Sequence, residues 1–322
     1  MLTFFDHIDV TPVATGEWVD TDLSAYLPSG ATGAALAVVS SSENARLVGS
    51  RPHGSSANFY KYLCSGSRVM HIVACDASRH VDLYRQDGDE AFYLLAALDS
   101  DFVLFSPASY VDVSTATTGS YQDVDITAHV TGGDTAIAAI VFVEDGGSDP
   151  VIGLRANGSS FDDPKEHYFG GHSIIVPVDA GEVFEQKTSN AGETVYLQGY
   201  IKGDAWTFLD PPTEIGPAGA GSYADLAALP AGATAGYYFA ASGYEQAWHV
   251  RKNGTSTDHY KLSWGWGASI VELDANRVAE AKVESTGMNL YVWGYYAPAP
   301  DIPEALTINA YQSGSNIIVA WS

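Results

Sequence analysis

The segment VRKNGTSTDHYKL, residues 250–262, places an arginine, two further residues, a glycine and a hydroxyl residue between two strand-like stretches. The same arrangement occurs in GLRANGSSFDDPKEHYF at 153–169 and in GSRPHGSSANFYKYL at 49–63. The shared positions are Arg51, Gly54 and Ser55; Arg155, Gly158 and Ser159; and Arg251, Gly254 and Thr255. A turn that occurs three times in one chain indicates either a repeated domain or a repeated site.

Three further features recur with this turn in a fixed order. Each copy opens with an aromatic residue two positions before an aspartate, and later contains an Asp-Ala pair and a strand of alternating aromatics. The opening aromatics are Trp18, Tyr121 and Tyr223, the Asp-Ala pairs begin at Asp76, Asp179 and Asp274, and the aromatic strands are 92–98, 195–201 and 290–296. The arginine precedes the Asp-Ala pair by 25, 24 and 23 residues. Such regular spacing indicates tandem duplication of one unit.

A unit of about 100 residues has the usual size of a β-sandwich domain. The first copy contains short segments of strand-forming residues separated by turns, and no segment keeps a helical period. These segments are 17–23, 33–40, 45–50, 58–63, 68–74, 80–86 and 91–98. The sequence therefore predicts an all-β chain with three tandem β-sandwich domains, and it leaves jelly-roll and immunoglobulin-like topologies open. The expected domains are 1–110, 117–212 and 219–298, the last two separated by a linker rich in Pro and Gly.

The final segment, APDIPEALTINAYQSGSNIIVAWS at 299–322, differs from the three copies. It resembles the opening of a fibronectin type III module, in which a proline-rich entry precedes two strands and the second strand ends in tryptophan. We therefore expect a C-terminal hairpin or the start of a further fibronectin-like module.

Charge and hydropathy exclude two classes of partner. The 322 residues include 15 Lys+Arg and 39 Asp+Glu, for a net charge of −24. Such a surface repels nucleic-acid phosphates, and no basic run offsets it. The longest apolar run, TAIAAIVFV at 135–143, is about half of the roughly 20 residues that a membrane-spanning helix needs. The opening MLTFFDHIDV lacks the basic and apolar regions of a signal peptide.

Motifs that carry catalysis or bind cofactors are missing from the sequence. There is no G-x-S-x-G elbow, no phosphate-binding loop and no suggestive cysteine–histidine pair. The acidic pairs at 20–22, 123–125 and 162–163 could bind Ca²⁺, but none matches an EF-hand loop, and solvated acids are the expected reading. We expect no enzyme activity, no catalytic residues, no cofactor and no metal site.

The repeated turn has a structural interpretation. Asn-Gly in the second and third copies favours a type I′ hairpin turn, in which both central residues have positive φ. The arginine can contact carbonyls or a carboxylate of a neighbouring strand, with the aspartate of the opening element as one candidate. The functional alternative is a polar rim that touches a partner subunit or a sugar.

Four tryptophans of the third copy could instead stack on sugar rings: Trp248, Trp264, Trp266 and Trp293. Tryptophans in the protein core are the simpler interpretation. If these residues act as a site, the chain is a carbohydrate- or receptor-binding module of a virion or a secreted protein.

The stretches GEWVDTDLSAYLPSGATGAALAVV at 16–39 and GSYQDVDITAHVTGGDTAIAAIVFV at 119–143, each followed by an Arg-x-x-Gly-Ser turn, carry a family resemblance. They resemble repeat domains in structural proteins of tailed bacteriophages and gene transfer agents. The resemblance implies a non-enzymatic virion component, either a head decoration or spike protein or a tail or fibre protein. It implies assembly in the host cytoplasm, a place on the virion surface, and contacts with other virion proteins. Homo-oligomerisation is expected, with a trimer favoured and a host surface glycan as a further partner.

Overall fold

The computed structural model describes most of the chain. The described residues are 2–42, 44–57, 60–63, 67–106, 109–116, 118–144, 151–162, 165–166, 171–189, 194–216, 220–241, 246–259, 261–263, 266–285, 288–299, 308–313 and 316–321. Only the backbone is described at 60–63, 165–166, 261–263, 266, 308–313 and 316–321. No helix among these residues has the length and apolar character needed to cross a membrane.

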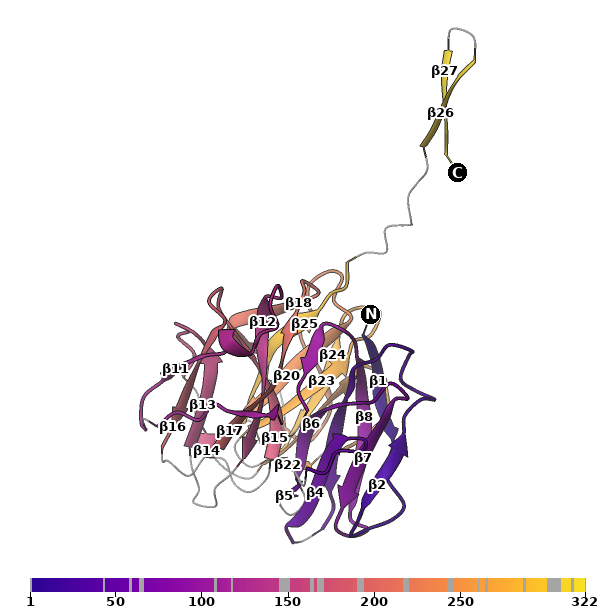
Figure 1. Ribbon diagram of the computed structural model, residues 1–322. Helices are drawn as coiled ribbons and strands as arrows, with labels where there is room; N and C mark the ends of the chain where they lie inside the picture. Colours follow the sequence, from indigo (N-terminus) through magenta and orange to yellow (C-terminus); the bar gives the residue numbers. More distant parts are fainter. Residues whose placement is uncertain are drawn as a thin grey trace.

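Unit 1 is a sandwich of two four-stranded antiparallel sheets (Figure 1). Its strands are β1 (Thr3–Asp9), β2 (Trp18–Asp22), β3 (Gly33–Ser40), β4 (Arg46–Pro52), β5 (Tyr60–Leu63), β6 (Arg68–Ala74), β7 (His80–Arg85) and β8 (Glu90–Leu98). One sheet, here called the inner sheet, has the order β1-β8-β3-β6, and the other, the outer sheet, has the order β2-β7-β4-β5.

Units 2 and 3 repeat this order. The strands of unit 2 are β9 (Phe102–Leu104), β10 (Val111–Asp112), β11 (Gln122–Asp125), β12 (Ala136–Glu144), β13 (Val151–Ala156), β14 (Lys165–Glu166), β15 (Gly171–Pro177), β16 (Val183–Thr188) and β17 (Thr194–Lys202), with a 3₁₀ turn η2 (Thr127–His129). The strands of unit 3 are β18 (Trp206–Glu214), β19 (Ala224–Asp225), β20 (Ala235–Ala241), β21 (Gln246–Lys252), β22 (Lys261–Ser263), β23 (Trp266–Glu272), β24 (Ala279–Val283) and β25 (Asn289–Tyr296).

The strand order distinguishes between the two topologies that the sequence left open. The inner sheets are β10-β17-β12-β15, with β9 also on β17, and β18-β25-β20-β23; the outer sheets are β11-β16-β13-β14 and β19-β24-β21-β22. In every unit the first strand pairs with the last, and the next pairs with the last but one, if β9 and β10 of unit 2 are counted as one first strand. Two four-stranded sheets connected in this way form a jelly roll. The all-β prediction of three sandwiches is therefore confirmed, and each sandwich is a jelly roll.

The first strand of each unit is interrupted. In β1 the register with β8 shifts between Phe4 and Ile8, and in β18 the register with β25 shifts between Phe208 and Thr213. In unit 2 the corresponding strand is divided into β9 and β10, which both pair with β17. Units 2 and 3 therefore begin at these strands, before the expected boundaries of 117 and 219. The expected linker between the second and third copies overlaps the end of β18.

The middle strand of each inner sheet is buried on both faces. In β3, Leu36 and Val38 point into the core of unit 1, whereas Ala35 and Ala37 belong to a second cluster that extends across all three units. In β20, Tyr238 points into the core of unit 3, whereas Tyr237 and Phe239 join that second cluster. We call this shared group of buried residues the central cluster.

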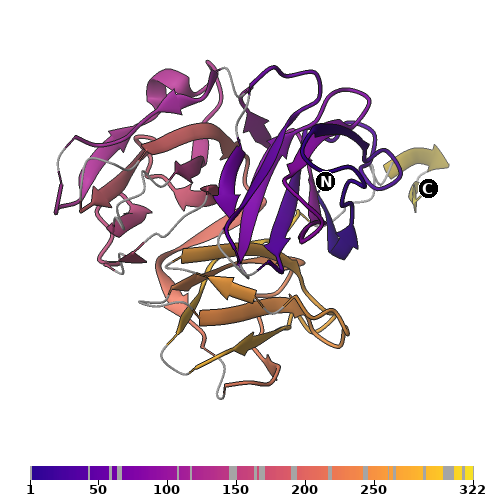
Figure 2. The ribbon, with the colours of Figure 1, turned by 90° about the horizontal axis from the view of Figure 1, so that it is seen from below.

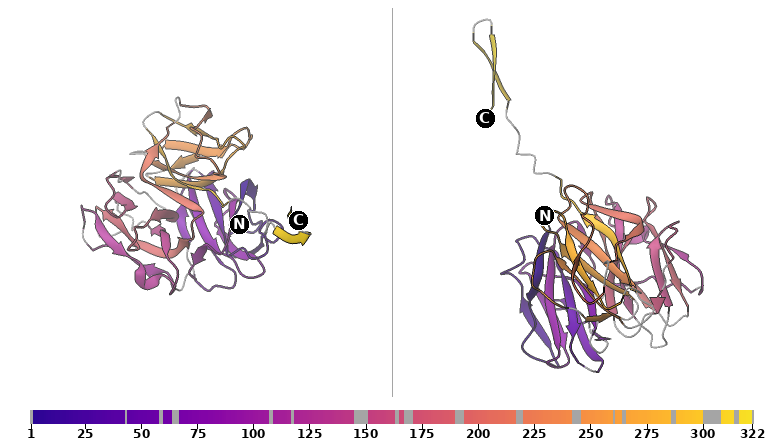
Figure 3. Two further views of the ribbon diagram at one scale, coloured as in Figure 1. Left: turned by 90° about the horizontal axis from the view of Figure 1, so that it is seen from above. Right: turned by 180° about the vertical axis from the view of Figure 1, so that it is seen from behind.

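The three inner sheets face one another around a common centre. Figure 2 and the left view of Figure 3 show three lobes arranged around this centre, one for each unit. The strands β6, β15 and β23, which occupy the same place in each unit, contact one another there. Ile72, Ile175 and Ile270 stand at equivalent positions of these strands, and all three are buried in the central cluster. The chain thus forms a pseudo-threefold body from a single polypeptide.

Hydrogen bonds between units satisfy edge-strand amides at this centre. The N–H of Ile72 donates to Oγ of Ser173 at 2.9 Å, and the N–H of Ile175 donates to the Tyr237 hydroxyl at 3.0 Å. β6 and β15 are edge strands, so the amides on their free side have no partner strand within their own sheets. Burial without a partner would cost free energy, so the side chains of the neighbouring unit complete the strand edges.

The last two strands, β26 (Ile308–Ser313) and β27 (Asn316–Trp321), form an antiparallel hairpin. Their register runs from Ile308 opposite Trp321 to Ser313 opposite Asn316. They pair with each other and with no other described strand. Whether the hairpin begins a fibronectin-like module stays a prediction.

Removal of one hydroxyl at the centre is expected to destabilise the contact between units 2 and 3. Tyr237→Phe leaves the buried N–H of Ile175 without an acceptor, which costs about 1–3 kcal/mol. Tyr238→Phe is the matched control, because the buried Tyr238 hydroxyl has no hydrogen-bond partner in the described structure and its loss should leave stability unchanged or raise it. Urea unfolding followed by tryptophan fluorescence measures both, and equal midpoints for the two variants would contradict this account.

Candidate functional site

The repeated turn has the same backbone in all three units. The N–H of the hydroxyl residue donates to the carbonyl three residues earlier: Ser55 to Pro52, Ser159 to Ala156 and Thr255 to Lys252, at 3.1, 3.1 and 3.3 Å. The glycine has a positive φ in each case: 75° at Gly54, 72° at Gly158 and 81° at Gly254. Neither Asn157 nor Asn253 has a positive φ, so the expected type I′ turn is wrong. Only the glycine position requires the left-handed conformation.

The arginine connects three parts of the outer sheet, as Arg251 illustrates. Its Nε donates to Glu280 on the neighbouring strand β24 at 2.7 Å, and its Nη1 donates to the carbonyl of Thr257 at 2.6 Å. Its guanidinium lies 3.5 Å from the ring centroid of Tyr223, the opening aromatic of unit 3. Arg251 and Glu280 are each only 12% exposed, so the pair is largely withdrawn from water.

Units 1 and 2 contain the same three contacts. The partners of Arg51 are Asp82 at 3.1 Å, the carbonyl of Ala57 at 2.9 Å and the ring of Trp18 at 4.1 Å. The partners of Arg155 are Glu185 at 2.5 Å, the carbonyl of Phe161 at 3.0 Å and the ring of Tyr121 at 3.6 Å. The carboxylate comes from the neighbouring strand rather than from the opening aspartate, and the opening element supplies the aromatic ring instead. The three arginines lie on three separate outer sheets and are held by their own units.

Two of these turns also contact a neighbouring unit. Oγ1 of Thr257 donates to Asp6 on β1 at 2.7 Å, and Oγ of Ser159 donates to Asp210 on β18. Both acceptors lie in the interrupted part of the first strand of the next unit. The turns of units 2 and 3 therefore help to hold the three units together within one chain.

The tryptophans proposed for sugar stacking fall into two groups. Trp248 and Trp293 are each 1% exposed. Trp293 stacks on Tyr237, with ring centroids 6.3 Å apart and an interplanar angle of 17°, inside the central cluster. A buried indole cannot present its face to a sugar. Trp264 lies outside the described residues, and only the backbone of Trp266 is described, as the first residue of β23.

A group of histidines lies where unit 1 meets unit 3. His7 sits at the interruption of β1 with a φ of 56°, a conformation that few residues other than glycine adopt. Its Nε2 is 3.4 Å from Nε2 of His249 and 3.2 Å from a terminal guanidinium nitrogen of Arg68. The ring of His259 lies 4.9 Å from the ring of His7 and 3.9 Å from that of Tyr93. We call His7, Arg68, His249 and His259 the histidine junction.

The histidine junction holds one buried positive charge. Burial lowers the pKa of Arg68 to about 10, which leaves the guanidinium charged at neutral pH. Burial lowers the pKa of His7 to about 4. The charge of Arg68 lowers this pKa further, whereas Asp6 partly opposes the shift. Burial also lowers the pKa of His259 to about 4 and that of His249 well below its usual value. These rings are therefore neutral in the folded protein.

The remaining partners of the histidine junction are polar but mostly neutral. Arg68 donates to Oγ of Ser269 at 2.9 Å and lies 5.5 Å from the ring of Trp248. His249 Nδ1 is 2.6 Å from the hydroxyl of Tyr223, which donates to Asp258 at 2.8 Å. The interface therefore combines packed aromatic rings with one buried cation and depends on the neutral state of its histidines.

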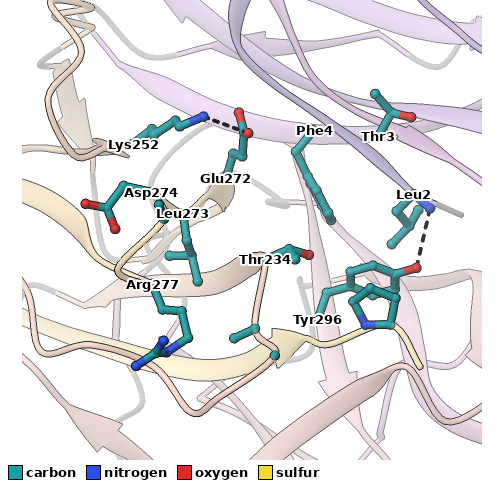
Figure 4. A pocket seen from close by; sticks show the side chains of 14 residues that line it. Leu2, Thr3, Phe4, Thr234, Lys252, Glu272, Leu273, Asp274, Arg277 and Tyr296 are labelled. Atoms are coloured by element: carbon teal, nitrogen blue, oxygen red, sulfur yellow. Dashed lines mark hydrogen bonds and ion pairs between the residues drawn. The ribbon is translucent and has the colours of Figure 1, made fainter. Parts of the chain in front are cut away.

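An open groove of about 690 Å³ lies between units 1 and 3 (Figure 4). Its wall combines apolar side chains such as Leu2 and Phe4 with a Lys252–Glu272 ion pair at 2.7 Å. The hydroxyl of Tyr296 accepts a hydrogen bond from the N–H of Leu2 at 3.4 Å. Arg277 donates to the carbonyl of Leu229 at 3.0 Å, and Asp274 accepts from Asn253 at 3.3 Å. No nucleophile lies beside a base among the described residues that line the groove.

Comparison with known proteins gives limited information. No family model and no curated protein matches the chain. One solved chain, described as "The Triple Jelly Roll Fold and Turret Assembly in an Archaeal Virus", aligns at 11% identity and a TM-score of 0.25, over 90% of this chain and 89% of the other. A chain from the structure of the lipid-containing bacteriophage PM2 aligns at 10% identity and a TM-score of 0.11, over 88% and 87%. Both similarities are weak, so the jelly-roll assignment rests on strand order alone.

The arginine turn can be tested with two adjacent substitutions that remove the same charge. Arg251→Gln leaves the largely buried Glu280 without its cation and should lower the free energy of unfolding by about 2–3 kcal/mol. Lys252→Gln removes an ion pair whose partners are each 32% exposed and should cost at most about 1 kcal/mol. Chemical denaturation of both variants gives the comparison, and similar losses would argue against a structural role for the arginine.

Acidification is expected to weaken the histidine junction. His7 titrates near 6.5 when unfolded and near 4 when folded, so between these values the unfolded chain binds more protons. The free energy of unfolding therefore falls as the pH drops from about 6.5 to about 4, by on the order of 3 kcal/mol from His7 alone. Burial raises the pKa of Glu90 to about 7, which opposes this trend below neutral pH, so the contribution of His7 must be isolated by a variant.

His7→Asn is the suitable variant, because asparagine tolerates a positive φ and does not titrate. The stability difference between the natural chain and this variant, measured by urea unfolding, should shrink as the pH falls through the interval. Parallel stability curves for the two proteins would contradict the assignment.

Proposed function

We propose that this chain is a non-enzymatic structural protein of a virion. It would present its jelly rolls at the particle surface, either as a head decoration or spike or as a tail or fibre component. The observation that carries the proposal is the closure of three jelly rolls around a common centre in one chain. Jelly rolls recur in viral capsid proteins and in lectins, and they offer contact surface rather than a fixed chemistry. The resemblance of the repeats to domains of phage and gene-transfer-agent structural proteins supports the same reading.

The arrangement limits which surfaces can contact other proteins. The inner sheets are buried against one another, so partners would meet the outer sheets, the loops and the groove between units 1 and 3. With a net charge of −24, the chain favours partners that offer basic surface. We propose other virion proteins as these partners, with assembly in the host cytoplasm.

A homotrimer, which the sequence favoured, would have to form through other faces. The centre that three separate chains would share is filled here by three units of one chain. Further copies would therefore bind through the outer surface, where a stable contact needs upward of about 1,200 Å². Homo-oligomerisation stays a prediction.

The alternative function, carbohydrate or receptor binding by stacked indoles, loses part of its basis. Two of its four tryptophans are buried in the interior and face protein. Glycan binding stays a prediction for other surfaces of the chain.

The proposal is tested on particles. Antibodies raised against the purified chain should label the surface of intact particles released from cells that carry its gene, as seen by immunogold electron microscopy. Antibodies against a cytoplasmic protein of the same cells serve as the control. If the chain stays in the soluble fraction and particles are unlabelled, the proposal is wrong.

A further inference from the structure

Four side chains converge on the outer sheet of unit 1. Asp20 lies on β2, Asp82 and His80 lie on the neighbouring strand β7, and His53 lies in the repeated turn after β4. His53 Nδ1 is 2.9 Å from Oδ1 of Asp82 and 3.4 Å from Oδ1 of Asp20. His80 Nδ1 is 2.6 Å from the same oxygen of Asp20. Ligand atoms of Asp20, His53 and Asp82 thus lie close together, and His80 contacts this group through Asp20.

The spacing of these atoms suits a small metal ion. One ligand atom from each of Asp20, His53 and Asp82 lies within 4.8 Å of the others. Ligands placed 2.0–2.2 Å from a tetrahedral ion are separated by roughly 3.3 Å, and two of the separations here are 2.9 and 3.4 Å. The side chains of Asp20, His53 and His80 are 49%, 39% and 26% exposed, so an ion has access from solvent.

One carboxylate is already oriented by a partner behind it. Arg51 Nε donates to Oδ2 of Asp82 at 3.1 Å, which turns Oδ1 toward His53. Asp82 is 9% exposed, so this oxygen has little freedom to turn away. Hydrogen bonds of this kind fix the ligands of known metal sites. The repeated arginine, structural in all three units, would orient a ligand in unit 1.

Units 2 and 3 provide an internal comparison. The histidine of the turn is replaced by Asn157 and Asn253, which donate instead to Asp179 and Asp274 of the Asp-Ala pairs at 2.7 and 3.3 Å. The backbone N–H of His80 donates to Asp76 at 2.8 Å. Val183 and Val278 make the same hydrogen bond in units 2 and 3, so a valine takes the place of His80 in each. Asp82 becomes Glu185 and Glu280, which reach the arginine. Unit 1 therefore differs from the other two units at three positions, and all three residues lie next to Asp20.

From this arrangement we propose that unit 1 binds one divalent transition-metal ion of the zinc class through Asp20, His53 and Asp82, with His80 holding Asp20 in place. Imidazole nitrogens select such ions over Ca²⁺ and Mg²⁺, which prefer oxygen ligands alone. The ion would bridge β2, β7 and the turn after β4, and would clamp one end of the outer sheet. Since the ligands are supplied by one unit, only one of the three lobes would carry the ion.

The test uses the full chain after treatment with a chelator. Calorimetric titration with Zn²⁺ should show one ion bound per chain, and the thermal midpoint should rise when Zn²⁺ is present. Co²⁺ in place of Zn²⁺ should give the visible absorption of a four-coordinate ion. An excess of Ca²⁺ or Mg²⁺ should displace neither bound Zn²⁺ nor bound Co²⁺.

The matched variant carries His53→Asn and His80→Val, the residues that units 2 and 3 place there. It should keep the natural unfolding midpoint in chelator and lose the bound ion, with affinity for Zn²⁺ at least tenfold weaker. His129→Asn, a histidine of unit 2 outside the cluster, should bind Zn²⁺ like the natural chain. If the double variant fails to fold, Asp20→Asn gives the same comparison at an exposed ligand.

Two outcomes would overturn the proposal. Either the natural chain binds no Zn²⁺, in which case the four residues form ion pairs only, or the double variant binds it as tightly as the natural chain.

Discussion

Each inner sheet of this chain is apolar on both faces, and this constraint determines the rest of the architecture. One face fills a jelly roll in the usual way. The other face would be a large apolar surface in water, of a kind that soluble monomers rarely expose. All three units carry such a face, and the three faces are buried against one another. The strands β6, β15 and β23 meet at the common centre as a result. The outer sheets then remain for the repeated arginine turns and for any partner.

Much of this fold could be predicted from the sequence, and the missing part has one physical cause. The seven segments expected in unit 1 correspond to β2 through β8. The first strand of every unit was missed because each is interrupted: β1 by the shift around His7, unit 2 by the gap between β9 and β10, and β18 by the shift before Thr213. An interrupted strand lacks the continuous alternation of apolar and polar residues from which a strand is predicted. β3 is buried along its whole length, and the sequence alone does not identify what covers its second face.

On the outer sheets, too, some of the chemistry could be predicted from the sequence and some could not. The arginine turn was expected to be structural, with carbonyls or a carboxylate as partners; the carboxylate that Arg251 contacts is Glu280 rather than the aspartate of the opening element. Its stacking on Tyr223 was not foreseen, because the two residues are far apart in the chain and meet only through strand pairing. No metal site was expected at His53. Its meeting with Asp20 and His80 depends on the cross-strand register, which spacing along the chain does not reveal.

The covalent linkage of the three lobes has a consequence for how such a body forms and changes. Three separate chains must find one another, and their trimer dissociates on dilution, whereas linked units meet at an effective concentration in the millimolar range. The shape of this chain is therefore independent of how much of it is present. A gene for a homotrimer also changes all three subunits with each mutation. Here a substitution alters a single lobe, so one lobe can become different from the other two while the centre of the pseudo-symmetric body stays the same.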